Sequence, residues 1–175
     1  MKKLTLTDGI RSVGEVRTWT FEGDLPPFDE REMRRFLDDH AYADIWARQV
    51  GQTVQPNLVV NAGRARLVAL SVQESTTRFS YIALSTSTVS PSQADTSLTS
   101  ELIRKAASIV SSYATYYIRV VANFGTTSFN STGIVGEGVF DTASTGGTML
   151  ADASISLSKT NTQSAVVEHR VLMST

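Results

Sequence analysis

Residues 133–147 read GIVGEGVFDTASTGG. In the first part, apolar residues and glycines surround a single glutamate, Glu137; the second part ends in small polar residues and paired glycines. This pattern predicts a strand, a turn and a returning strand, that is, a β-hairpin. Asp141 is placed to begin the turn, where an aspartate can hydrogen-bond nearby backbone.

Strand patterns continue on both sides of this hairpin. Apolar and polar residues alternate, or β-formers cluster, in four further segments: 78–84, 115–124, 152–159 and 164–173. Several short strands separated by turn signals favour a β-sandwich or jelly roll. Residues 106–175 are also rich in Ser and Thr and poor in charge, which fits either an ordinary β domain or a surface lying against neighbouring subunits.

The N-terminal third has a different character. Residues 15–23, EVRTWTFEG, read as a short strand inside an otherwise extended arm, which Pro26 and Pro27 end. Asp29 and Glu32 have the spacing of a capping box and predict an amphipathic helix that runs to Gly51. We therefore expect an arm over residues 1–55 and a β-sandwich domain over residues 56–175.

Two further segments favour helix. Residues 58–72 predict a second helix, although their β-branched residues leave a strand open. Residues 98–108 can form a helical turn or two. The predicted fold is thus mainly β, a sandwich or jelly-roll-like domain with an extended N-terminal arm and one or two helices.

The composition of the chain excludes several classes of partner and of chemistry. The 175 residues carry a net charge of −1, no cysteine and no long apolar window. These features give no reason to expect nucleic acid or membrane as a partner, and they exclude disulfides and thiolate chemistry. The first residues hold no apolar core of secretory length, so we expect a soluble protein without an export signal.

Catalytic and metal-binding patterns are weak. His40 and His169 are far apart, no nucleophile elbow or phosphate loop is present, and acid pairs such as Asp95 with Glu101 or Glu137 with Asp141 rest on proximity alone. We expect no enzyme, no metal and no cofactor. A buried Glu137 would need hydrogen-bond donors, from Arg104 or from backbone N–H groups.

Three ordered segments, over roughly residues 57–158, resemble a pattern in tailed-bacteriophage virion proteins, including the attachment domain of tail-collar fibres. They are Asn61-Ala62-Gly63; the strand 82–84 leading through 85–87 into Asp95-x-x-Leu98-x-x-Glu101-x-x-Arg104; and 137–141 followed by Gly146-Gly147 and 149–151. The chain differs at Ser85 and Ser87, where such proteins more often carry glycine.

The resemblance implies a structural protein in the virion, assembled in the host cytoplasm. Six residues are then expected to hold the fold rather than to catalyse: Glu137, Asp141, Arg104, Asp95, Glu101 and Gly63. If the chain ends at Thr175, no fibre shaft follows, which favours a compact subunit.

The arm favours a capsid decoration, or cement, protein that bridges neighbouring major capsid subunits and forms a dimer or trimer. A tail, neck or baseplate component and a receptor- or carbohydrate-binding module remain alternatives. Four aromatic residues are either interface anchors or a cap on the chain's own core: Trp19, Phe21, Phe28 and Trp46.

Overall fold

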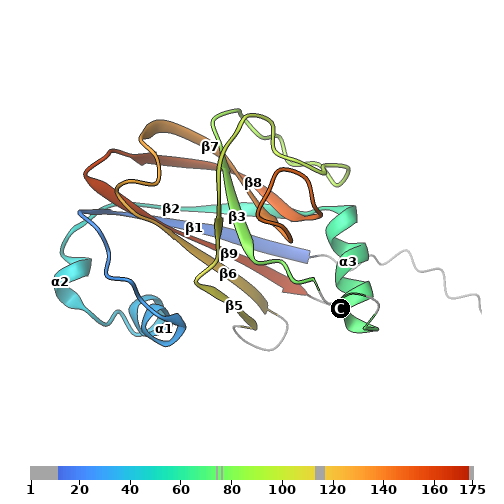
Figure 1. The fold of residues 1–175 in the computed structure, drawn as a ribbon, viewed down its shortest axis with the longest axis horizontal. Coiled ribbons are helices and arrows are strands. Elements are labelled where there is room, and N and C mark those ends of the chain that lie inside the picture. Colours follow the sequence, from blue (N-terminus) through green and yellow to red (C-terminus); the bar gives the residue numbers. More distant parts are fainter. Residues whose placement is uncertain (1–11, 74, 76, 113–116, 174–175) are drawn as a thin grey trace, which may run out of the picture.

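A computed structural model describes residues 12–73, 75, 77–112 and 117–173 of the chain. Within these residues it contains nine strands and three short helices (Figure 1). In chain order they are β1 (Ser12–Glu22), α1 (Glu30–Asp38), α2 (Ala43–Trp46), β2 (Gln49–Val59), α3 (Asn61–Ser71), β3 (Tyr81–Ser85), β4 (Glu101–Ala106), β5 (Ile109–Ser112), β6 (Tyr117–Phe124), β7 (Ser131–Phe140), β8 (Met149–Lys159) and β9 (Gln163–Met173).

All nine strands belong to one antiparallel sheet, in the order β4-β3-β7-β8-β2-β1-β9-β6-β5. The sheet is so strongly curled, into a half-barrel, that β3 and β4 contact β6. The mainly β class is confirmed, whereas the two-sheet sandwich or jelly roll is wrong. Alternation along a strand shows that a face is buried, but a curled sheet and a second sheet can bury it equally well.

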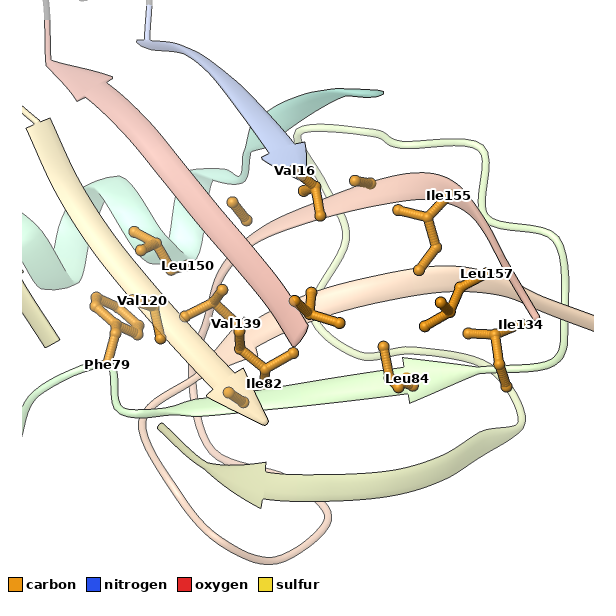
Figure 2. Close-up of a cluster of buried hydrophobic side chains, with 14 of the residues drawn as sticks. Val16, Phe79, Ile82, Leu84, Val120, Ile134, Val139, Leu150, Ile155 and Leu157 are labelled. Atoms are coloured by element: carbon orange, nitrogen blue, oxygen red, sulfur yellow. The ribbon is translucent and has the colours of Figure 1, made fainter. Parts of the chain in front are cut away.

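The concave face encloses the main core. Figure 2 shows side chains from several strands converging there, among them Val16, Ile82, Val120 and Val139. Helix α3 adds partly buried leucines to the same cluster. Because successive side chains of a strand point to opposite faces, the intervening residues lie on the convex face.

Two smaller clusters lie outside the main core. One packs α1 and α2 against aromatic and apolar side chains of β1, β5, β6 and β9. The other joins β3, β7 and β8 to Leu98 and Val60. Both faces of several strands are therefore buried, and this explains the adjacent buried valines Val120 and Val121 in β6 and Val166 and Val167 in β9.

The N-terminal strand is not part of an arm. β1 pairs along its length with β2 on one side and β9 on the other, so it lies inside the sheet. The extended arm is thus wrong for residues 12–22, and the predicted boundary between residues 55 and 56 falls inside β2. Residues 1–11, and the start of the strand predicted at 115–124, lie outside the described residues.

The helix predictions are partly correct. The capping box at Asp29 and Glu32 is confirmed, but α1 ends at Asp38, because His40 and Tyr42 adopt positive φ values of 50° and 67° and break the run before α2. Gly51 lies within β2 rather than at a helix end.

In the segment predicted at 58–72, residues 58–59 complete β2 and α3 occupies Asn61–Ser71. Residues Glu101–Ala106 form β4, not a helical turn, because they pair with β3. In the described part of the chain, no helix combines the length and apolar character that a membrane span requires.

Candidate functional site

Glu137 lies in the concave core. Its side chain on β7 is fully buried, and its Oε2 lies 2.8 Å from Nδ1 of His169 on β9, which is also fully buried. Three strands separate β7 from β9 in the sheet order, so the contact crosses the interior of the half-barrel. This position makes the pair a brace between the two sides of the curl.

Asn57 holds the other side of the imidazole. Its Nδ2 lies 2.7 Å from Nε2 of His169 and donates to the carbonyl of Arg170 at 2.8 Å. An amide nitrogen only donates, so Nε2 accepts and Nδ1–H donates to Glu137. Gly14 leaves room for this arrangement, because a Cβ there would collide with the Asn57 side chain and the Arg170 carbonyl.

The structure places Glu137 as a buried, hydrogen-bonded group, but its partner was not predicted. Arg104 does not reach it; Arg104 pairs instead with Glu101 at 2.6 Å and lies 3.7 Å above the ring centre of Phe140. Nη1 of Arg104 also donates to the carbonyls of Ser144 and Gly146, at 2.7 and 3.0 Å. Arg104 and Glu101, both predicted, therefore hold the turn that follows β7.

Asp141 begins that turn, as predicted. Its Oδ1 accepts the backbone N–H of Thr148 at 2.7 Å, and its Oδ2 pairs with Arg66 of α3 at 2.8 Å. The predicted hairpin is confirmed as the pairing of β7 with β8. Asp141 thus joins the hairpin to α3, and Arg66 is a partner that the sequence pattern did not identify.

Gly63 allows α3 to approach β8. A Cβ at this position would collide with the backbone carbonyl of Leu150. The residue is buried within α3, so the helix can lie directly on the strand only because the side chain is a hydrogen.

Asp95 lies beside a second acid, Asp152, on the convex side of the sheet. Asp95 accepts the backbone N–H of Ser92 at 2.7 Å, and both carboxyl groups line a cleft of about 120 Å³. The pKa of Asp152 is raised to about 7, first by burial, then by the hydrogen bond and negative charge of Asp95, and then by the charge of Glu137. Asp152 was not predicted, because it shares the polar positions of β8 with Ser154 and Ser156 and so has the pattern of a solvent-facing residue.

A buried ionic cluster lies beneath α1. Arg119 of β6 and Glu168 of β9 are both fully buried, with Nε and Oε1 2.5 Å apart. Arg119 also pairs with Asp38 of α1 at 2.9 Å, and Glu168 with Arg170 at 2.9 Å. These residues link α1 to the sheet. The alternating sequence around Glu168 predicted that it lies in a strand, but not its partners.

The four aromatic residues predicted at an interface belong to the cluster that packs α1 and α2 against the sheet. Trp19 and Phe21 are buried, and Phe28 and Trp46 are partly buried against them. Trp46 stacks on Phe36 of α1 with ring centres 4.6 Å apart. The alternative of a cap on the chain's own core therefore describes their observed contacts.

The sheet splits between β2 and β8. These strands pair only at Leu58 and Val59 of β2, and beyond that point a cleft of about 290 Å³ opens between them. Its lining is uncharged and consists mainly of hydroxyl and amide side chains: Thr18, Thr20, Gln52, Thr53, Ser156, Ser158 and Gln163, with Val50, Gly51 and Leu157. Within the described residues, no strand pairs with this edge of β2 from Gln49 to Asn57.

Comparison with known proteins finds no matching protein family, no matching curated protein and no matching solved structure.

Proposed function

We propose that the chain is a structural protein of a tailed-bacteriophage virion that binds neighbouring major capsid subunits and stabilises the shell. Two lines support a role in protein binding. The residues that carry the virion-like pattern make fold-holding contacts: Arg104 with Glu101, Asp141 with Arg66, and Gly63 against β8. Glu137, the acid considered as a catalyst, is buried against His169.

The observation that carries the proposal is the open edge of β2. Backbone N–H and C=O groups at a sheet edge can pair with an added strand, and this edge runs beside the uncharged cleft. On the same strand, the exposed fractions of Val50 and Val54 are 54% and 49%. Two exposed valines next to free backbone groups suit an extended peptide segment with apolar side chains.

The occupant that we propose is an extended segment of a major capsid subunit. The cleft lining has no charged residue, so it offers no ion pair to a charged small molecule, whereas its hydroxyl and amide groups can hydrogen-bond peptide backbone. Strand addition supplies main-chain hydrogen bonds, and the flanking valines supply apolar contact. Several copies on one shell would bind more strongly because each bridges more than one subunit.

The strand around Trp19 cannot itself pair with a sheet edge on a neighbour, because both edges of β1 are taken by β2 and β9. The free edge in the same region of the sheet belongs to β2.

The direction of the backbone N–H and C=O groups along β2 decides which substitution tests strand addition. The N–H of Val60 donates to the carbonyl of Leu150 on β8, and backbone direction alternates along a strand. Residues 58, 56, 54 and 52 therefore direct their backbone groups toward the open edge. Pro56, which has no N–H, already occupies one of these positions. A second proline at Val54 would remove an outward N–H without removing a bond to β1.

The experiment compares Val54→Pro with Val54→Thr in binding to shells assembled from the major capsid protein. Val54→Pro should keep its fold, shown by circular dichroism, and bind at least about tenfold more weakly, because a lost edge hydrogen bond and a steric block act together. Val54→Thr keeps the N–H and should bind within about threefold of the unchanged chain. Equal binding by the folded proline variant would refute strand addition at β2.

A carbohydrate- or receptor-binding module is the second candidate. The hydroxyl and amide lining of the cleft favours it, since such groups hydrogen-bond sugars. The described lining contains no aromatic side chain, which is the usual apolar platform for a sugar ring. Specific micromolar binding on a glycan array, lost on Ser156→Val, would support this candidate over the first.

A further inference from the structure

The loop of residues 86–100 covers the convex face of β7 and β8 and is fixed at several points. Its start and end are tied by the Ser85 hydroxyl, which donates to the carbonyl of Thr99. Its middle is held by the N–H of Asn61, which donates to the carbonyl of Gln93 at 2.8 Å. Leu98 packs into the cluster beneath it. Asp95 is thereby positioned over β8.

Asp152 of β8 lies beneath this loop, and one of its carboxyl oxygens, Oδ1, has no hydrogen-bond partner among the described residues. Its side chain is only 1% exposed. The charges that act on it, those of Asp95 and Glu137, are both negative. A buried carboxylate without a counter-charge is unfavourable, so the site lacks a positive charge.

We propose that Asp95 and Asp152 hold a Ca²⁺ ion beneath the 86–100 loop. Both carboxyl groups line the same cleft of about 120 Å³, a space of roughly four water molecules. The cleft is also lined by four hydroxyl residues: Thr88, Ser90, Ser97 and Thr99. The lining thus offers oxygen donors and no histidine or cysteine.

The carboxylate and hydroxyl oxygens of this cleft favour Ca²⁺ over Mg²⁺. Ca²⁺ accepts six to eight oxygen ligands in flexible geometry, which two carboxylates, hydroxyls and retained waters can supply. Mg²⁺ needs near-ideal octahedral geometry and gives up its waters reluctantly, so it should bind more weakly. In the described parts of the chain no three acidic or histidine side chains converge, and two carboxylates therefore imply a modest affinity.

Calorimetric titration of the EDTA-treated chain with CaCl₂ at pH 8 tests the site. We expect a Kd of about 10⁻⁴–10⁻³ M and a melting temperature raised by several degrees in excess Ca²⁺. Asp152→Asn and Asp95→Asn should each weaken binding at least about tenfold. Asp44→Asn, which changes an exposed acid of α2, should bind as the unchanged chain does.

Asp152→Asn can still donate a hydrogen bond to Asp95, so this variant should fold, and its melting curve checks that it does. Absence of any heat or melting shift with Ca²⁺, or equal binding by the folded Asp152→Asn variant, would overturn the proposal. Because the titration uses the isolated chain and a site away from the β2 edge, its result is independent of capsid binding.

Discussion

Glu137 and His169 form a hydrogen-bonded pair across the concave face, with Oε2 and Nδ1 2.8 Å apart, although β8, β2 and β1 lie between their strands in the sheet. A flat sheet would keep these side chains several strand spacings apart. The pair therefore shows that the sheet curls strongly, and together with Asn57 it forms a polar group that ties β7 to β9 beside the apolar core.

The first prediction concerns the proton on His169. Because Asn57 donates to Nε2, the neutral ring should carry its hydrogen on Nδ1. Long-range ¹H–¹⁵N correlation at pH 8 should show a protonated Nδ1 and an unprotonated Nε2. The opposite tautomer would mean that Asn57 presents its oxygen to the ring and that Glu137 is not an acceptor from His169.

Glu137→Gln tests the brace. The amide keeps the shape of the side chain, and its oxygen can still accept the ring N–H, but its NH₂ group takes the place of Oε1, a buried position with no hydrogen-bond partner among the described residues, so the free energy of unfolding should fall by about 1–3 kcal/mol. Urea unfolding measures this change. Glu30→Gln, which weakens an exposed pair with Arg34, should cost less than about 1 kcal/mol. Equal losses in the two variants would contradict the brace.

Asp152→Asn should change how stability depends on pH. The carboxyl group keeps its proton to about pH 7 when folded, against a model value of 3.8, so the folded state binds more protons between these values. The free energy of unfolding of the unchanged chain should lose this contribution as the pH rises from about 4 to 7, and lose no more above it.

Asparagine does not titrate, so the Asp152→Asn variant avoids this loss. Its free energy of unfolding should therefore rise relative to that of the unsubstituted chain between about pH 4 and 7, and exceed the expected difference at low pH by about 1–3 kcal/mol at pH 8. Parallel unfolding curves with EDTA at pH 5 and pH 8 measure the difference. A stability difference that is the same at both pH values would show that Asp152 titrates as an ordinary carboxyl group.

Gly63→Ala tests the contact of α3 with β8. Alanine favours a helix by about 1 kcal/mol over glycine, but here its Cβ would collide with the carbonyl of Leu150. We expect a net loss of about 1–3 kcal/mol in the free energy of unfolding. Gly133→Ala is the matched control, since nothing lies within 4 Å of a Cβ at that site. A Gly63→Ala variant as stable as the control would mean that α3 is not closely packed on β8.

Local patterns predicted local structure well. The capping box at Asp29 and the hairpin after Glu137 depend on residues close in sequence, and both are present. The same patterns did not predict how strands associate. Alternation in β1 shows two distinct faces, yet only the pairing with β2 and β9 shows that it is an inner strand.

The candidate sites show the same limit. Arg104 and Glu101 were both expected to hold the fold and are found together, although their pairing was not predicted. The partner of Glu137 could not be predicted, because His169 lies 32 residues away and reaches it only through the curl of the sheet. Asp152 has a solvent-facing pattern, and the 86–100 loop that buries it has no periodicity from which its position could be predicted.

The central claim is that many copies of the chain coat a capsid by binding its major subunit. Absolute quantification of the chain against the major capsid protein in purified virions tests it most directly, together with a map of the particle. The account predicts copies on the order of hundreds, distributed over the shell. A few copies confined to one vertex, or none in the particle, would contradict it.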